Sequence, residues 1–284
     1  MEKPLFILPF DHRTSFKKDI LGISGDLNAK QKKEIEELKE IVFQGFLRVF
    51  RKRKDKNSFA ILIDEEFGQE IIKKAKRQGI KICLAVEKSG QKEFDFEYGE
   101  EFGKHVKKIN PDFVKALVRY DTFQKEINKI QLERLRKLNR FCQKEKYPLI
   151  FELLTPITPS ESKLEKTLAA VKEIKKEIKV DVWKMEGFSE KEWQEIIEKI
   201  KEDSKIIVLG RGEDKEQVKK WLSESSNIKE IIGFAIGRTV FASALKDYVR
   251  GKISKEEAIE LIAENFNFFL DFWENKKKKN SKQK

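Results

Sequence analysis

The sequence predicts a single-domain (β/α)8 TIM barrel, a fold of the α/β class. Eight short apolar segments alternate with amphipathic segments along 284 residues. Most of the apolar segments are nearly free of polar residues, as is typical of parallel strands buried on both faces. No Gly-x-Gly-x-x-Gly motif follows the first segment, and no Pro-, Gly- or Ser-rich linker divides the chain. These two absences argue against the alternative, an open doubly wound sheet.

The expected elements follow from the spacing of apolar residues. Strands are predicted at residues 5–9, 59–63, 80–86, 113–118, 149–154, 180–183, 206–209 and 231–236. Helices are predicted at residues 30–50, 67–78, 100–109, 122–145, 161–178, 189–202 and 214–223, and two more close the chain at 239–249 and 254–273. In the first helix, for example, Ile35, Leu38, Val42 and Phe46 recur at helical spacing.

The barrel is expected to occupy residues 1–274, followed by a disordered, lysine-rich tail at residues 275–284. The formal net charge is +12, from 61 Lys and Arg against 49 Asp and Glu. The tail holds six lysines and no acid, and residues 48–56 hold six basic residues and one Asp. Nucleic-acid binding usually needs basic residues spread over one face with interleaved aromatics, so we do not expect it here.

Several other classes of protein are excluded by composition. No apolar run approaches the roughly 20 residues of a membrane span, so no membrane partner is expected. The first residues lack the features of a signal peptide, and we expect a cytoplasmic protein in which Cys83 and Cys142 stay reduced. Two histidines and two cysteines make a Cys/His metal site improbable, and we expect neither a metal nor another cofactor. A homo-oligomer is left open.

Two lysines inside predicted strands are the first candidates for chemistry. Lys115 and Lys184 each interrupt an apolar segment, which is costly unless the amine is paired or functional. Burial and a neighbouring ammonium group are expected to lower a lysine pKa, and a neutral amine can attack a carbonyl. Glu152 lies on the strand between them, so all three side chains can point at one carbonyl. The alternative for a single lysine is an amine that extends to the barrel mouth.

Active sites of TIM barrels form at the C-terminal ends of the strands, which adds further candidates. Asp11 ends the first strand and should face the cavity, although residues 11–13 could also be a surface turn. Gly210-Arg211-Gly212 and Gly237-Arg238-Thr239 follow the seventh and eighth strands, where phosphate often binds. Glycines let backbone N–H groups approach a phosphate, and arginine binds it in a bidentate manner. The alternative is a pair of tight turns with surface arginines.

Five segments of the chain carry a family resemblance that runs from residue 5 to about residue 273. They are Leu8-Pro9-Phe10-Asp11-His12-Arg13 with Ser15-Phe16, Val114-Lys115-Ala116-Leu117-Val118-Arg119-Tyr120, Asp181-Val182-Trp183-Lys184-Met185-Glu186-Gly187, Gly233-Phe234-Ala235-Ile236-Gly237-Arg238-Thr239-Val240-Phe241, and Gly251-Lys252-Ile253-Ser254 with Glu256-Glu257-Ala258. The chain resembles the 2-deoxy-5-keto-D-gluconate 6-phosphate aldolase domain, within the class I tagatose-bisphosphate-type aldolases.

The resemblance implies a metal-free lyase that cleaves a phosphorylated ketose through a lysine imine (a Schiff base). It implies that Lys184 forms the imine beside Lys115, that Glu152 shuttles protons, and that Asp11 handles the proton of the hydroxyl next to the broken bond. It places Arg211 and Arg238 at the phosphate, and we group Arg13, Gly210 and Gly237 with them as substrate- or phosphate-binding residues.

The reaction implied by this resemblance is cleavage of 2-deoxy-5-keto-D-gluconate 6-phosphate to dihydroxyacetone phosphate and malonic semialdehyde, a step of carbohydrate metabolism. Three alternatives remain. The first is a tagatose- or fructose-bisphosphate aldolase. The second is a phosphosugar isomerase or epimerase that uses Glu152 and Asp11 as acid and base. The third is a non-catalytic phosphosugar-binding barrel.

Overall fold

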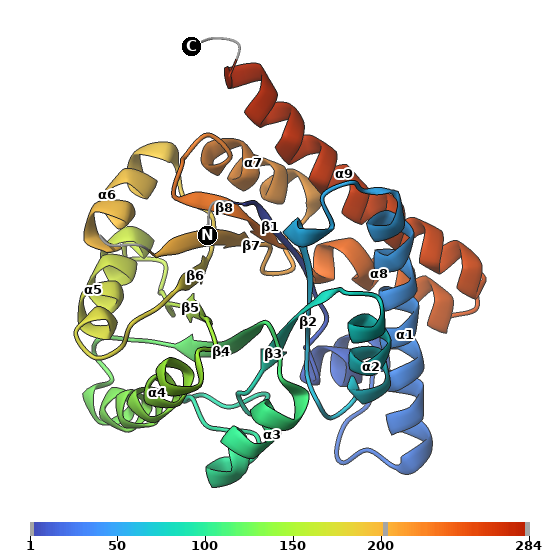
Figure 1. Cartoon of the computed structure of the whole chain (residues 1–284), viewed down its shortest axis with the longest axis horizontal. Helices are drawn as coiled ribbons and strands as arrows, with labels where there is room; N and C mark the ends of the chain where they lie inside the picture. Colours follow the sequence, from blue (N-terminus) through green and yellow to red (C-terminus); the bar gives the residue numbers. More distant parts are fainter. Residues whose placement is uncertain (1–2, 201–203, 282–284) are drawn as a thin grey trace.

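The strands form a closed parallel barrel, which confirms the predicted fold (Figure 1). The computed structural model describes residues 3–200 and 204–281. Each strand pairs in parallel with the next, and the eighth pairs with the first. The strands are β1 (Leu5–Pro9), β2 (Phe59–Ile63), β3 (Lys81–Ala85), β4 (Phe113–Arg119), β5 (Leu149–Leu154), β6 (Val182–Met185), β7 (Lys205–Leu209) and β8 (Ile231–Ala235).

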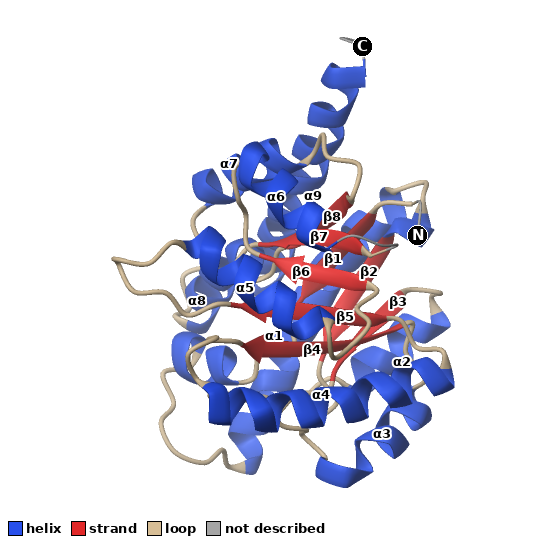
Figure 2. Ribbon diagram, turned by 90° about the vertical axis from the view of Figure 1, so that its left-hand side faces the viewer, coloured by secondary structure: helices blue, strands red, loops and turns tan. Residues whose placement is uncertain are grey.

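Helices surround the barrel and cover its outer face (Figures 1 and 2). All the predicted helices are present, with ends that differ by a few residues except at the last; residues 201 and 202 of the helix expected at 189–202 lie outside the described residues. They are α1 (Ala29–Lys52), α2 (Gln69–Arg77), α3 (Phe102–Ile109), α4 (Lys125–Glu145), α5 (Lys163–Lys175), α6 (Glu190–Ile200), α7 (Lys215–Ser225), α8 (Arg238–Val249) and α9 (Lys255–Ser281). Short turns of helix lie at η1 (Phe16–Ile20), η2 (Lys56–Ser58) and η3 (Gly99–Glu101). None of the helices in the described ranges is both long and apolar enough to cross a bilayer.

The buried apolar residues form two clusters, one inside the barrel and one between the barrel and the helices. The inner cluster takes alternate residues of each strand, including Phe113, Ile150 and Val182. Because side chains alternate along a strand, the residues two positions further on also face inward. Those residues are Lys115, Glu152 and Lys184, and they lie one layer closer to the C-terminal ends of the strands. The strand register pairs Glu152 directly with Lys184.

The tail differs from the expectation of disorder beyond residue 274. Helix α9 continues to Ser281, and its last turns extend beyond the body of the molecule (Figure 2). No glycine or proline interrupts this segment, and lysine is a good helix former. The ammonium groups of Lys276 and Lys277 also lie over the rings of Phe272 and Trp273, one turn earlier. Residues 282–284 of the expected tail lie outside the described residues.

Candidate active site at the C-terminal ends of the strands

A buried network of lysines and carboxylates lies inside the barrel mouth. The Nζ atom of Lys115 is 2.9 Å from Oδ2 of Asp11 and 2.8 Å from Oε2 of Glu152, and it also donates to Glu87. The other Glu152 oxygen, Oε1, is 2.7 Å from Nζ of Lys184. Four of the predicted residues thus lie in one chain of ion pairs, in which Glu152 bridges the two lysines.

The electrostatics of Lys115 differ from the prediction of a lowered pKa. Burial alone lowers the pKa of this amine, but the carboxylates of Asp11, Glu152 and Glu87 outweigh burial and raise it well above the ordinary value. The prediction counted the neighbouring lysine and not the carboxylates that β1, β5 and the end of β3 bring to the same point. Lys115 is therefore a permanent ammonium group, which makes it unsuited to attack a carbonyl.

The carboxylates respond in the opposite direction. Burial raises the pKa of Glu152, but Lys115 and Lys184 oppose burial and bring the pKa down to about 2. Burial likewise raises the pKa of Asp11, and Lys115, His12 and Lys184 together bring it below the usual range of an aspartate. Both carboxylates are ionised at neutral pH.

Glu87 is a member of the network that the sequence prediction did not single out. Cys83 and Ala85 of β3 belong to the inner cluster, so alternation also turns Glu87 inward. Ala85 pairs with Lys115 in the register, which brings the carboxylate to the amine. One of its oxygens, Oε2, is buried without a hydrogen-bond partner. The alternation of β3 was the signal that could have identified it.

The two predicted phosphate-binding arginines come together at the ends of β7 and β8. A guanidinium nitrogen of Arg238 donates to the backbone carbonyl of Arg211, and Arg211 itself pairs with Glu186. Arg211 has a backbone φ of 51° in the left-handed region, which is uncommon for a residue other than glycine and is often found at functional sites. Gly210 and Gly237 lie beside them. A Cβ atom on Gly237 would lie 2.3 Å from the carbonyl oxygen of Pro9, so only glycine fits there.

The side chain of Arg13 is buried and bound to neighbouring groups of the protein. Its side chain is held by the carboxylate of Glu97 and by the backbone carbonyl of Glu87. Burial opposes its charge, but Asp64, Glu97 and Glu87 raise the pKa of Arg13 above its ordinary value. Its Nε atom has no hydrogen-bond partner. The surface turn considered as an alternative for residues 11–13 is wrong at Arg13, because this side chain lies in the wall of the mouth.

A cavity of about 260 Å³ opens onto this network. Its wall contains Asp11, His12, Arg13, Thr14, Ser15, Glu87, Lys88, Ser89, Gly90, Lys115, Leu117, Arg119, Glu152, Leu154, Leu209, Arg211 and Arg238. Lys184 does not form part of the wall. It is 4% exposed and contacts the wall through its ion pair with Glu152. Within the described part of the chain, no group of three His, Cys, Asp or Glu side chains could hold a metal ion.

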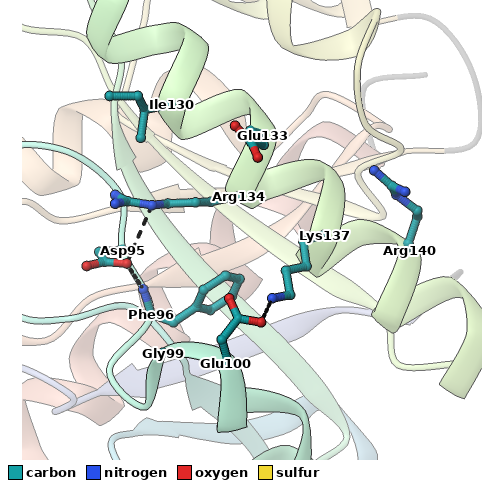
Figure 3. A pocket seen from close by; sticks show the side chains of 9 residues that line it. All are labelled: Asp95, Phe96, Gly99, Glu100, Ile130, Glu133, Arg134, Lys137 and Arg140. Carbon is teal, nitrogen blue, oxygen red and sulfur yellow. Dashed lines mark hydrogen bonds and ion pairs between the residues drawn. The ribbon is translucent and has the colours of Figure 1, made fainter.

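A larger cavity, of about 650 Å³, lies outside the barrel between α4 and the segment before α3 (Figure 3). Charged side chains on its two sides pair with each other. Arg134 is 3.6 Å from Asp95, and Lys137 pairs with Glu100. None of its lining residues belongs to the lysine network, so this cavity offers no chemistry of the kind found inside the barrel.

Comparison with known proteins identifies the family. A family model described as "Uncharacterized protein conserved in bacteria" matches residues 1–277. The chain belongs to the DUF2090 family. The match spans the whole barrel and nearly all of α9, so the lysine network lies within the matched residues. No curated protein sequence is significantly similar to this DUF2090 chain.

Solved structures share the fold of this DUF2090 protein at low sequence identity. A Schiff-base-forming fructose-1,6-bisphosphate aldolase is 13% identical, with a TM-score of 0.57 and coverage of 94% of both chains. An archaeal fructose 1,6-bisphosphate aldolase is 12% identical, with a TM-score of 0.56, covering 95% of this chain and 94% of the other. A protein from Corynebacterium glutamicum is 13% identical, with a TM-score of 0.60 and coverage of 93% and 86%. The barrel is therefore aldolase-like in fold.

Proposed function

We propose that this protein is a class I aldolase that cleaves a phosphorylated ketose through an imine on Lys184. The observation that carries the proposal is the bridge from Lys184 through Glu152 to Lys115. It places a buried amine 2.7 Å from a carboxylate that can move a proton, at the mouth of the barrel. Such a carboxylate is what carbinolamine formation and dehydration require.

Each member of the bridge has a separate task. Nζ of Lys184 passes a proton to Glu152 and attacks the ketose carbonyl, and the added nitrogen gives a second proton to the former carbonyl oxygen. Glu152 then returns its proton to the resulting hydroxyl, so that water leaves and the iminium forms. The C–C electrons then flow into the iminium nitrogen, which yields an enamine and an aldehyde. Lys115 stays charged, holds Asp11 and Glu152 in place, and returns Glu152 to its ionised form after each proton transfer. Because Lys184 contacts the cavity wall through Glu152, the carboxylate must turn aside as the carbonyl arrives.

The charges around the cavity favour a substrate with an anionic group at each end. Arg211 and Arg238 lie after β7 and β8, and Lys88 and Arg119 lie on the opposite side, after β3 and at the end of β4. The preferred substrate is 2-deoxy-5-keto-D-gluconate 6-phosphate, which carries a carboxylate and a phosphate. Its products would be dihydroxyacetone phosphate and malonic semialdehyde. Fructose and tagatose bisphosphates also carry two anions, and the shared fold supports them as the second candidate.

The test is borohydride trapping with dihydroxyacetone phosphate and with a panel of phosphorylated ketoses. A class I aldolase is expected to gain the mass of the reduced ligand, and peptide mapping is expected to locate the adduct at Lys184. An isomerase, an epimerase or a non-catalytic barrel would gain no mass. An adduct at Lys115 would contradict the assignment of Lys184.

We expect Arg238→Ala to raise the KM for a phosphorylated ketose by about 10–100-fold, because hydrogen bonds to a charged group contribute roughly 1.5–3 kcal/mol. Inhibition by inorganic phosphate should weaken in parallel. Steady-state kinetics over a range of substrate concentrations measures both effects. Removal of residues 279–284, which comprise the last three residues of α9 and the three that the structure does not describe, is the control and should change neither. If the truncation raised KM and Arg238→Ala did not, the phosphate site would lie elsewhere.

A further inference from the structure

His12 is a cavity residue that the mechanism above does not use. It follows Asp11 at the end of β1, and its side chain is 26% exposed in the cavity wall. Its Nδ1 atom is buried without a hydrogen-bond partner, 3.8 Å from Oδ1 of Asp11. A buried nitrogen without a partner is costly, and a positive charge on the ring would strengthen its interaction with this carboxylate.

The imidazole ring is held in place by packing. It meets the ring of Phe241 edge-on, with 6.1 Å between the ring centroids. Gly237 comes so close that a Cβ atom there would lie 3.3 Å from Cε1 of His12. The ring is thereby fixed between Asp11 and the start of α8, where Arg238 begins the helix. This position lies between the phosphate end and the lysine network.

Burial is the main reason that His12 is neutral. Burial, Arg238 and Lys184 together lower its pKa to about 4, against the opposing effects of Asp11 and Glu152. At neutral pH the ring therefore has one nitrogen with a free lone pair. Asp11, by contrast, is bound to Lys115 through Oδ2, and its pKa is held well below that of His12. Of these two neighbours, His12 is the stronger base.

We infer that His12, and not Asp11, is the general base that takes the hydroxyl proton when the C–C bond breaks. The inference rests on the proposed class I aldolase function. The proton moves from the substrate hydroxyl to an imidazole nitrogen, and the O–H electrons form the carbonyl of the leaving aldehyde. The C–C electrons pass to the iminium nitrogen and give the enamine. The imidazolium releases its proton to solvent at the cavity mouth, and the enamine carbon takes up one proton before hydrolysis.

Asp11 then has a positioning role. Its Oδ1 atom faces Nδ1 of His12, so the carboxylate stabilises the imidazolium as it forms. Its other oxygen is fixed by Lys115, which keeps the carboxylate in its ionised form. Asp11 therefore connects the base to the lysine network without itself accepting the proton.

The test separates imine formation from bond cleavage in His12→Gln and His12→Ala. Trapping of dihydroxyacetone phosphate on Lys184 involves no C–C cleavage and should stay within about threefold of the native protein. Cleavage of 2-deoxy-5-keto-D-gluconate 6-phosphate, or of fructose 1,6-bisphosphate, should lose about 10²–10⁴-fold in kcat. Added imidazole should restore part of the cleavage in His12→Ala, which a merely structural role of His12 would not produce. His105→Gln and His105→Ala, which change the other histidine of the chain on α3, outside this cavity wall, are the matched controls.

The outcomes are distinguishable from failure of the proposed function. If the native protein traps no ligand, the imine mechanism itself is wrong. If trapping persists and both His12 variants still cleave at the native rate, His12 is not the base. If the folded variants lose trapping and cleavage together, or if imidazole restores nothing, His12 acts in binding and the inference is overturned.

Discussion

Lys184→Met is expected to lower kcat by roughly 10⁴-fold or more, because it removes the nucleophile on which the proposed imine pathway depends. Methionine has a similar length and is tolerated in a buried position, and Glu152 keeps its second partner, Lys115, at 2.8 Å. The variant should therefore fold. Activity assays and borohydride trapping with dihydroxyacetone phosphate measure the effect.

The matched control for this substitution is Lys172→Met, which changes an exposed lysine on α5. It should retain both turnover and trapping. A Lys184→Met protein that folds and still cleaves a ketose would contradict the proposed mechanism, because the nucleophile would then have to be another group.

Lys115→Met is expected to lower the free energy of unfolding by about 3–5 kcal/mol at pH 7, because it leaves buried carboxylates without their cation. Asp11, Glu87 and Glu152 all contact this one amine. Total stability of a domain is only about 5–15 kcal/mol, so the loss is large. Urea denaturation followed by circular dichroism measures it.

The loss should shrink in acid. In the native protein, Asp11 and Glu152 have lowered pKa values, so their contribution is present above the unfolded-state pKa near 4 and is lost as the pH falls through the folded-state values. Without Lys115, burial loses the largest charge that opposes it at both carboxyls, so both pKa values should rise. The variant then loses less stability than the native protein as the carboxylates take up protons. The difference between the two proteins should therefore be smaller at pH 4 than at pH 7, and a constant difference would contradict this account.

Lys39→Met separates stability from activity. Lys39 is also fully buried and pairs with Asp64, beneath Phe16 and Phe67. It does not line the cavity at the barrel mouth. Its replacement should destabilise the fold, while the protein that remains folded still traps dihydroxyacetone phosphate.

The fold could be predicted from the sequence because strands buried on both faces are nearly pure apolar segments, and amphipathic helices separate them. The sequence also predicted that Lys115, Glu152 and Lys184 would converge, since alternation fixes which strand residues face inward. The end of α9 was missed because helix formation there depends on local propensity and on lysines lying over Phe272 and Trp273. The local sequence alone did not distinguish a continued helix from a disordered tail.

The electrostatics could not be predicted in the same way. The pKa of Lys115 depends on carboxylates from β1, β5 and the end of β3, which are distant in sequence and meet only when the barrel closes. Arg13 was predicted to bind substrate, but its guanidinium group also forms an ion pair with Glu97. His12 looked like a turn residue because its burial depends on Phe241, more than two hundred positions later.

The ion-pair network affects which charge state of the Lys184 nitrogen is stabilised. Three carboxylates and two ammonium groups give the resting cluster a net charge of −1. In the proposed mechanism, the iminium carries the same positive charge as the ammonium it replaces, so the cluster has the same charge before attack and at the moment of bond cleavage. The free amine, the carbinolamine and the enamine are neutral at this nitrogen and leave one positive charge fewer in its place. The negative charge of the cluster therefore stabilises a cation at this nitrogen. It favours the iminium, which is the state that draws electrons out of the C–C bond.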